Sequence, residues 1–452
     1  MAPRIPCADS LESTLVTESL RARIDGLFTA RQALAPGFGE PAAPVSPASP
    51  AAQNDGPETA APSISHRVLR DAAWPLALVL IAHRILISAV NGSPTDDFTT
   101  VYSAIRRMLA GDSVYAQAYD HVDPLYLYNP GATLLLTPLG LADNPTAARM
   151  AFILVNAACI IAALALLTRL VDKPLSGATL PFAIALAYAT ESVTNTLTFS
   201  NINGVLLLFL TGWLYLFIRG AQGQTKRMWL AGLVLGIAIL VKPQFAPLLA
   251  LHIVKLDWKG LVGGSGVPAL ANVIAWPLVP GTEDFTGKLL PYLGTTRDYA
   301  NSSWPGVNAY FQLSSGLYYT VWAGMALIVA AGLIALLRRR HTDVALWAMT
   351  TAPLVLVGVF FLSSLGQQYY SMWLAPLLFT IFARRNALET WLPWLGAVLC
   401  LAPMSWTSVQ WPDAGRWMNF FAGTAGWAFV IIGVSAAALG WWAHERVESR
   451  HD

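Results

Sequence analysis

The amino-acid sequence predicts an all-α polytopic membrane protein with about ten to twelve transmembrane helices. Hydrophobic residues make up 55 % of the 452 residues and charged residues only 12 %, whereas soluble domains carry roughly 25 % charged residues. Apolar segments recur along the chain with short polar breaks between them. Lysine and arginine gather in alternate breaks, as they do in the cytoplasmic loops of membrane proteins. These observations exclude a soluble enzyme.

The first 72 residues differ in composition from the rest and predict a largely disordered cytoplasmic tail. A short amphipathic helix within this tail is predicted from apolar residues at roughly helical spacing, namely Leu11, Leu15, Leu20, Ile24 and Leu27. The stretch that follows them is rich in proline, alanine, serine and glycine. Because the first apolar run begins only near Ala72, no signal peptide is expected.

The transmembrane domain is predicted over residues 73–445, followed by a short cytoplasmic tail at 446–452. Since a spanning helix needs about 20 mostly apolar residues, the predicted spans lie near 73–90, 148–170, 178–194, 202–218, 228–241, 243–254, 260–280, 316–337, 344–362, 370–383, 391–405 and 421–442. The two short segments before and after Lys242–Pro243 are expected to be separate helices, because proline disfavours helical geometry in the residue before it.

The basic residues predict which loops share a side of the membrane. With a cytoplasmic N-terminus, the inward loops are the basic ones, "VDKPLSG", "RGAQGQTKR", "KLDWK", "RRRHTD" and "ARRNALE". The outward segments are 91–147, 191–201, the break at Lys242, 281–315, 363–369 and 406–420, and they are poorer in basic clusters and richer in Asp, Asn, Gln, Tyr and Trp. The adjacent carboxylates Asp96 and Asp97 are therefore predicted to face outward.

The first outward segment predicts two helices beside this acidic pair. Residues 98–109 have an apolar face with Arg106 and Arg107 on the polar side, which is typical of an amphipathic helix in the membrane interface, and Gly111 fits its C-cap. Residues 130–141 are apolar but too short to span, so they are expected to re-enter the membrane or skim its surface. The alternative is that both helices only pad the bundle.

Polar and aromatic side chains recur in the other outward segments. Amides and aromatic rings suit sugar hydroxyls, because they offer hydrogen-bond donors and acceptors together with flat apolar faces. Each residue taken alone is an ordinary loop residue, and it is their coincidence on one side that favours a binding site. The candidates for substrate binding are Asn201, Asn203, Asp298, Asn301, Gln367, Tyr369 and Tyr370, with Glu191 and Asn195 in the same stretch as the first two.

Two cations are candidates for binding a phosphate. Lys242 lies at the end of an apolar segment, where a charge is costly unless it reaches water or an anion. It could instead snorkel to the interface. Arg297 is the second candidate, whereas Arg84 is expected to have a structural role. An outward acid, a buried cation and a rim suited to carbohydrate predict the transfer of a sugar from a lipid phosphate, with a carboxylate as general base and a cation at the leaving group.

Cofactor chemistry has no support in the sequence. The chain has no glycine-rich nucleotide-binding loop, and Cys7, Cys159 and Cys400 are scattered without a CxxC pair. The seven histidines are dispersed and form no HExxH motif. Neither a metal nor a cofactor is therefore predicted, and no nucleic-acid partner is expected.

Several stretches resemble a known enzyme family. "TDDFTTVYSA" and "VDPLYLYNPGATLLLTPLG" are similar to the start of the GT-C polyprenyl-phosphate-dependent glycosyltransferases. "ATESVTNTLTFSNING", "LVKPQFAPLL", "LGTTRDYANSS" and "GQQYYSMWLAP" resemble the arabinofuranosyltransferase C branch of that superfamily. The likeness covers about residues 68–445 and leaves the N-terminal tail outside it.

This resemblance implies a GT-C fold and an inverting α-(1→3)-arabinofuranosyltransferase in the plasma membrane. The donor would be decaprenylphosphoryl-arabinose and the acceptor an arabinan chain of arabinogalactan or lipoarabinomannan, with membrane lipid around the site on the outer face. The resemblance favours Asp97 as the base, because it occupies the Asp-Phe position typical of the family, with Asp96 orienting the acceptor or the base. It also adds Tyr128 to the substrate-binding residues.

Two other functions stay open at this point. A mannosyltransferase of the same family would use polyprenyl-phosphate-mannose with the same site chemistry. A transporter of lipid-linked sugars would also need polar residues within the bundle, but it commonly shows repeated halves with matching broken helices. The sequence has one Lys-Pro break and no internal repeat.

Overall fold

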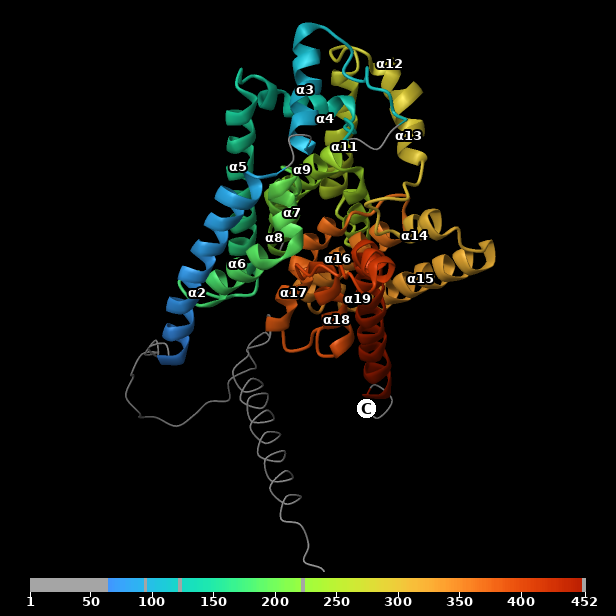
Figure 1. The fold of residues 1–452 in the computed structure, drawn as a ribbon. Coiled ribbons are helices and arrows are strands. Elements are labelled where there is room, and N and C mark those ends of the chain that lie inside the picture. The colour runs from blue at the N-terminus through green and yellow to red at the C-terminus, as the bar shows by residue number, and fades with distance from the viewer. Residues whose placement is uncertain (1–63, 93–95, 121–123, 221–223, 449–452) are drawn as a thin grey trace, which may run out of the picture.

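The computed structural model describes residues 64–92, 96–120, 124–220 and 224–448, which form helices without a β-strand among them (Figure 1). The predicted helix near Leu11–Leu27 and most of the predicted tail lie outside these residues. The first helix, α2, covers Ile64–His83 and so begins before residue 73, where the sequence places the start of the transmembrane domain. Hydropathy indicates only where the apolar residues of this helix begin. The helix itself starts earlier in the chain and includes the more polar stretch "ISHRVLRD".

The N-terminal half continues from α2 into a π-helical turn, η1 (Arg84–Ala89). The elements that follow are α3 (Asp97–Ala110), α4 (Pro130–Leu136), η2 (Thr137–Gly140), α5 (Pro145–Leu170), α6 (Thr179–Ala189), α7 (Glu191–Thr198), α8 (Asn203–Gly220) and α9 (Thr225–Val241). The predicted span at 178–194 is thus two helices. Thr190 breaks it, because its backbone is extended and its side chain accepts a hydrogen bond from the Val193 amide as the N-cap of α7.

The C-terminal half begins at the Lys242–Pro243 break, where Lys242 is extended and ends α9 as predicted. The elements are η3 (Pro243–Leu248), α10 (Leu249–Val254), α11 (Trp258–Ala275), α12 (Thr282–Asp284), η4 (Phe285–Leu289), α13 (Leu290–Gly294), α14 (Trp304–Phe311), α15 (Ser315–Leu336), η5 (Leu337–Arg340) and α16 (Val344–Leu362). The last are η6 (Gln368–Leu374), α17 (Ala375–Phe379), η7 (Thr380–Phe382), α18 (Trp391–Leu401) and α19 (Pro412–Glu448).

Six helical segments in the described ranges are long and apolar enough to cross a membrane, which makes the chain a multi-pass membrane protein. They are Arg67–Ala89, Pro145–Leu170, Asn203–Gly220, Ser315–Arg340, Val344–Leu362 and Pro412–His444. Of the further predicted spans, Thr179–Ala189, Pro243–Val254 and Trp391–Leu401 are shorter apolar helices. The expected ten to twelve full-length spans are therefore replaced, in part, by broken and short helices.

The contacts between loops support the predicted alternation of sides. At one end, Arg219 pairs with Asp172 at 3.1 Å, and Lys255 donates to the Arg340 carbonyl at 3.0 Å. At the other end, the Val114 amide donates to the Pro280 carbonyl at 3.1 Å, and the Ser302 amide donates to that of Gly366. Loops predicted inward thus contact one another, as do loops predicted outward.

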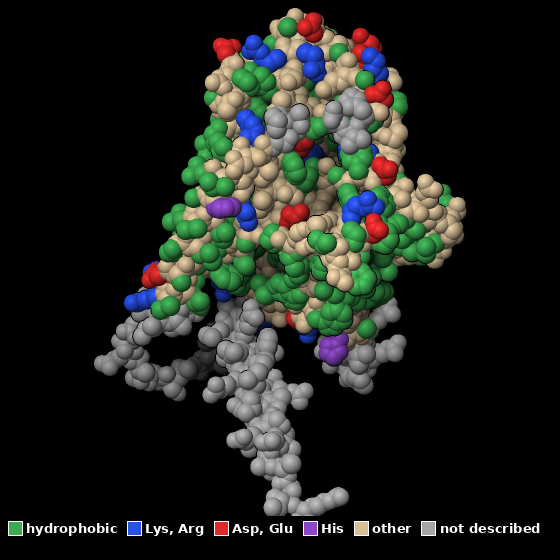
Figure 2. Space-filling view, in the orientation of Figure 1, with side chains coloured by type: hydrophobic (Ala, Val, Ile, Leu, Met, Phe, Trp, Pro, Cys, Tyr) green, Lys and Arg blue, Asp and Glu red, His purple; other side chains and the backbone are tan. Residues whose placement is uncertain are grey.

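Two of the segments predicted to face outward, 91–147 and 281–315, contribute α3, α4, α12 and α13, which form a cap at the upper end of the bundle in Figure 1. Figure 2 shows charged side chains gathered at this end and hydrophobic ones over most of the rest of the same face. In α3 the buried face holds Phe98, Val101, Ala104 and Ile105, and Gly111 caps the helix with φ 85°, as predicted. Leu109, expected on the apolar face, is exposed.

The short helix α4 does not skim the surface as one of the sequence-based alternatives held. Five of its seven residues are buried. A Cβ on Gly131 would lie 2.9 Å from the backbone of Asn272 in α11 and 3.0 Å from the Leu240 side chain of α9. Asn129 caps the helix and also donates to the Leu240 carbonyl at 2.7 Å. This helix is therefore fixed against the end of α9, next to Lys242.

Candidate active site

Asp96 is the N-cap of α3. Its Oδ1 accepts hydrogen bonds from the amide and the hydroxyl of Thr99, both at 2.8 Å, and its Oδ2 pairs with the Arg149 guanidinium of α5. Both carboxylate oxygens are therefore occupied, and the residue is fully enclosed. In this structure Asp96 caps α3 and pairs with Arg149, which favours Asp97 over it as the base.

Arg149 joins four elements and was not among the sequence-based candidates. Besides Asp96, it donates to the Ala89 carbonyl at 3.0 Å and to the Thr198 carbonyl at 3.2 Å. These carbonyls end η1 and α7. Nothing in the sequence marked Arg149, because its significance comes only from carbonyls that the fold brings beside it.

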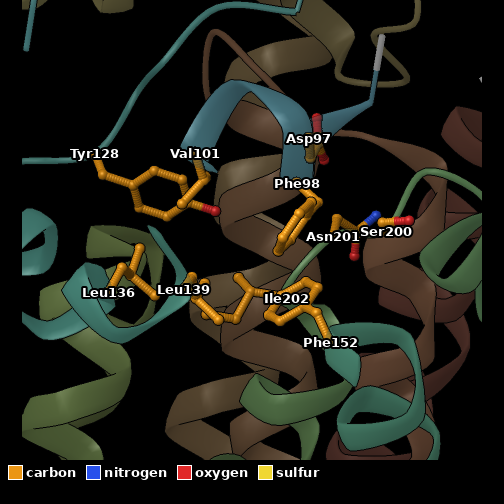
Figure 3. A pocket seen from close by; sticks show the side chains of 10 residues that line it. All are labelled: Asp97, Phe98, Val101, Tyr128, Leu136, Leu139, Phe152, Ser200, Asn201 and Ile202. Carbon is orange, nitrogen blue, oxygen red and sulfur yellow. The ribbon is translucent and has the colours of Figure 1, made fainter. Parts of the chain in front are cut away.

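Asp97, the next residue, faces a cavity instead of a protein cation. The cavity, called the Asp97 cavity below, has a polar wall of Asp97, Tyr128, Ser200 and Asn201. Its apolar side chains are Phe98, Val101, Leu136, Leu139, Phe152 and Ile202. Figure 3 shows Asp97 at its upper end, close to Asn201 and Ser200, with Leu139, Ile202 and Phe152 below.

Burial raises the pKa of Asp97 to about 6, and the negative charge of Asp96 adds to this effect. The positive charges of Lys242 and Arg297 act in the opposite direction. Both cations must therefore lie within electrostatic reach of Asp97. A carboxylate with this pKa is mostly ionised at neutral pH and can still accept a proton readily.

Lys242 does not snorkel to the surface. Its Nζ donates to Asn203 Oδ1 at 2.8 Å and lies 4.1 Å from the centre of the Tyr370 ring and 5.3 Å from that of Trp373. Burial lowers the pKa of Lys242 to about 7, while Asp97 favours its charged form. The aromatic faces stabilise a cation that has no carboxylate within ion-pair distance among the described residues.

Asn201 and Asn203 each have one unused donor. Both side chains are buried, and neither Nδ2 has a hydrogen-bond partner among the described residues. Asn201 Oδ1 accepts from the Asn203 amide at 3.1 Å, which orients the two side chains together. Because a buried donor without a partner costs free energy, two such donors beside Lys242 and Asp97 indicate a ligand with acceptor oxygens.

Three further candidates from the sequence surround Lys242. Gln367 accepts from the hydroxyls of Tyr369 and Tyr370, and this fixes two of the rings around the lysine, at 6.0 Å and 4.1 Å from its Nζ. The sequence did not identify Trp373, which stacks on Tyr370 with ring centres 5.1 Å apart. Arg297 lies against Tyr299, with its guanidinium carbon 5.4 Å from the ring centre.

The fold leaves two of the sequence-based candidates away from this arrangement. Asp298 is exposed. Asn301 is buried, but its side chain is used by backbone groups: Nδ2 donates to the carbonyls of Arg297 and Ser364, and Oδ1 accepts from the Gly366 amide at 3.0 Å. Asn301 thus holds the loop before α14 against the loop at 364–366, which precedes Gln367. As expected, Arg84 is structural and donates to the Tyr188 carbonyl at 3.0 Å.

Comparison with known proteins adds a family to this geometry. Residues 126–364 match the model of Glycosyltransferase family 87. The chain is 49 % identical over 369 residues to an alpha-(1->3)-arabinofuranosyltransferase of Corynebacterium glutamicum, a match that covers 82 % of this chain and 87 % of that protein. No solved structure gives a significant match.

Two mycobacterial proteins of the same name are more distant relatives. Identity is 38 % over 378 residues with the protein of Mycolicibacterium smegmatis, covering 83 % of this chain and 86 % of that one. It is also 38 % over 379 residues with the protein of Mycobacterium tuberculosis, with the same coverage of 83 % and 86 %.

The two acidic neighbours should respond oppositely when each is replaced by alanine. Asp96→Ala leaves Arg149 buried without its carboxylate, a change that typically costs about 3–5 kcal/mol, so the melting temperature should fall clearly. Asp97→Ala should leave the melting temperature at pH 7.5 unchanged or raise it, because a carboxylate whose pKa is raised by burial destabilises the fold when ionised. Thermal unfolding followed by tryptophan fluorescence in detergent measures both, and equal melting temperatures would refute the structural role of Asp96.

Proposed function

Because the chain belongs to glycosyltransferase family 87 and crosses the membrane several times, we propose that it is an inverting α-(1→3)-arabinofuranosyltransferase. It transfers arabinofuranose from decaprenylphosphoryl-arabinose to the 3-hydroxyl of an arabinan chain in arabinogalactan or lipoarabinomannan. One arrangement carries the mechanism: the partly buried carboxylate of Asp97 lies within electrostatic reach of Lys242, a cation held against aromatic rings, and two buried amides, Asn201 and Asn203, have donors without a partner among the described residues.

The lining of the Asp97 cavity supports a lipid phosphate as donor, because it is polar on one side and apolar on the other. The cavity has a volume of about 10 Å³, which means that it must widen to admit such a donor. The polar wall suits a sugar and its phosphate, whereas Leu136, Leu139 and Phe152 suit an isoprenoid chain. Leu135 and Leu141, which flank this apolar side in the sequence, are exposed. An isoprenoid chain in the bilayer can lie against such side chains without leaving the lipid.

The phosphate of the donor binds beside Lys242. The unused Nδ2 donors of Asn201 and Asn203 supply hydrogen bonds to its oxygens, and Lys242 supplies the charge. Arg297 adds a second positive charge at longer range. These groups stabilise the phosphate most when it leaves with an additional negative charge, which is the condition for lowering the barrier.

Asp97 is the general base. Its carboxylate accepts the proton of the acceptor 3-hydroxyl while that oxygen bonds to the anomeric carbon of the donor. The bond from the anomeric carbon to the phosphate oxygen breaks, and its electron pair leaves with the decaprenyl phosphate. A single displacement turns a β-linked donor into an α-linked product without a covalent sugar–enzyme intermediate. Tyr128, Tyr369 and Tyr370 enclose the sugar between Asp97 and Lys242.

The relatives favour arabinose over mannose. All three proteins described above bear the name of an arabinofuranosyltransferase, and the family is one of glycosyltransferases. No observation favours a mannosyltransferase or a transporter. The enzyme works in the plasma membrane, with residues 73–445 as its catalytic domain and Asp97 on the outer face, since the basic loops lie at the opposite end.

Replacing the base should abolish transfer. Asp97→Asn keeps the shape of the side chain but cannot accept the proton, so kcat should fall by about 10²–10⁴-fold. For the wild type, kcat/KM should decrease as the pH falls through about 6, because the carboxylate is then protonated. Transfer of labelled arabinofuranose from the donor to a synthetic linear arabinan measures both the loss of kcat in the variant and the pH dependence of the wild type. Full activity of Asp97→Asn, or a rate independent of pH between 5 and 7, would contradict this assignment.

Removing the cation should affect the donor more than the acceptor. Lys242→Ala deletes the charge beside the phosphate, so KM for decaprenylphosphoryl-arabinose should rise and kcat fall, together by about 10–100-fold in kcat/KM. The KM for arabinan should stay within twofold. Lys288→Ala removes an exposed lysine that pairs with Asp284 at 2.9 Å and is the matched control. An unchanged donor dependence in Lys242→Ala would leave the lysine a purely structural role.

The orientation in the membrane can be measured by cysteine labelling. Thr296 is exposed in the segment before Arg297, and Thr342 is exposed beside the basic residues 338–340 at the other end. In intact cells an impermeant maleimide should label Thr296→Cys and should label Thr342→Cys only after permeabilisation. The reverse pattern would show that the site faces the cytoplasm.

A further inference from the structure

A second cavity opens at the same end of the bundle as the Asp97 cavity. It has a volume of about 330 Å³ and lies between α7, η6, α18 and the start of α19. Its lining includes Glu191, Gln368, Met404, Ser405, Trp406 and Asn419. None of the groups in the mechanism above belongs to it. Figure 2 shows that the face drawn there is hollowed in its middle, with acidic and basic side chains near the hollow.

Glu191 is a carboxylate that the proposed reaction does not use. Its Oε1 accepts from Asn195 Nδ2 at 3.2 Å, and its Oε2 accepts from Gln368 Nε2 at 3.4 Å. Among the described residues, no lysine, arginine or histidine lies within ion-pair distance of it. Burial raises the pKa of Glu191. A partly buried carboxylate held only by two amides still has acceptor capacity for further donors.

We propose that this second cavity binds the arabinan acceptor, holding furanose residues beyond the one that reacts, with Glu191 and Gln368 bonding their hydroxyls and Trp406 packing against a ring. The inference rests on the proposed function and assigns a substrate to a site outside the Asp97 cavity. It concerns recognition of the acceptor and adds no step to the chemistry.

The charge of the cavity distinguishes the acceptor from the donor. A lipid phosphate would place a negative charge near the carboxylate of Glu191, which has no cation within ion-pair distance among the described residues, so the two charges would repel each other. A neutral polysaccharide instead offers only hydroxyl groups, each of which can donate to a carboxylate. Lys242 and Arg297 offset such repulsion near Asp97, whereas no cation in the described ranges lines the second cavity, which therefore disfavours a phosphate headgroup.

The exposed aromatic side chains nearby also suit a furanose ring. Trp406 is exposed at the mouth of the second cavity, and its backbone amide is fixed by Asn419 Oδ1 at 2.7 Å. Trp411 and Trp417 are exposed in the same segment. Flat apolar faces beside hydrogen-bonding groups match sugars, which have apolar C–H faces and polar edges.

Two direct links connect the two cavities. Helix α7 starts with Glu191 and ends at Thr198, just before Ser200 and Asn201 of the Asp97 cavity. A helix of eight residues is about 12 Å long. Gln367, whose oxygen fixes the tyrosines around Lys242, is followed directly by Gln368 of the second cavity. A short chain of sugars can therefore reach from Glu191 to Asp97, which a single pentose cannot.

The test is direct binding of linear arabinan oligosaccharides to the full-length protein in detergent, without donor. The wild type should bind an octasaccharide at least tenfold more tightly than a disaccharide. Glu191→Gln should weaken binding of the octasaccharide by about 10-fold or more, as expected for loss of hydrogen bonds to a charged group, and leave the disaccharide unchanged. Trp406→Ala, a truncation of an exposed side chain, should act in the same way without affecting folding.

Matched controls are Glu283→Gln, an exposed glutamate of α12, and Trp391→Ala, an exposed tryptophan at the start of α18. Neither should change the affinity for either oligosaccharide. Equal affinity of wild type and both cavity variants for the octasaccharide would overturn the proposal, as would a preference for decaprenyl phosphate in competition at this cavity. Because binding is measured without donor, a wild type that binds arabinan but transfers no arabinose would refute the proposed function alone.

Discussion

The ion pair between Asp96 and Arg149 is the interaction on which the geometry of the site depends. Arg149 holds the ends of η1 and α7 through their carbonyls while Asp96 caps α3. A further bond from the Asp97 amide to the Phe199 carbonyl at 3.1 Å ties α3 to the same place. Enclosed charges are stable only when paired and hydrogen-bonded, so this junction allows little displacement. The junction fixes the backbone of Asp97, while the side chain of Asp97 lines the cavity.

The break at Lys242–Pro243 supplies the opposite charge. A continuous helix would bury the lysine along its length, whereas the extended backbone at Lys242 lets its ammonium group reach Asn203 and the tyrosine rings. Helix α4, fixed to the last turn of α9 through Asn129, holds this break beside the wall that carries Tyr128. Asp97 and Lys242 are far apart in the sequence and share one low-dielectric space, which explains why each charge alters the pKa of the other.

In the mechanism proposed above, the two cavities recognise two chemically different substrates. The Asp97 cavity combines a carboxylate and an amide with an apolar wall, and the cations Lys242 and Arg297 lie within electrostatic reach of that carboxylate. The second cavity combines the carboxylate of Glu191 with exposed tryptophan. In the proposal, the two cations favour a phosphate near Asp97, and their absence from the lining of the second cavity favours a neutral glycan there. Helix α7 and the Gln367–Gln368 pair lie between them, so the separation of the cavities is set by rigid elements.

The sequence by itself determined the all-α membrane class, the alternation of basic loops, the helix at 97–110 with its Gly111 cap, and the break at Lys242. Composition, periodicity and proline geometry are local properties, and local properties can be read along the chain. It also singled out the Asp96–Asp97 pair, Lys242 as a charge in a costly setting, and both asparagines as amides suited to sugar hydroxyls. It could not assign Asp96 and Asn301 to structural roles, because the partners of these residues, Arg149 and the loop at 364–366, are distant in the sequence.

Only the tertiary structure decided which of two adjacent aspartates was left without a protein partner. The same holds for the enclosed α4, for Trp373 beside Lys242, and for Glu191 in its own cavity. Each depends on side chains that meet across the bundle, where packing and the cost of unpaired polar groups select one arrangement. Sequence spacing does not reveal that arrangement, because two neighbouring aspartates have the same chemistry and differ only once the fold places Arg149 beside Asp96.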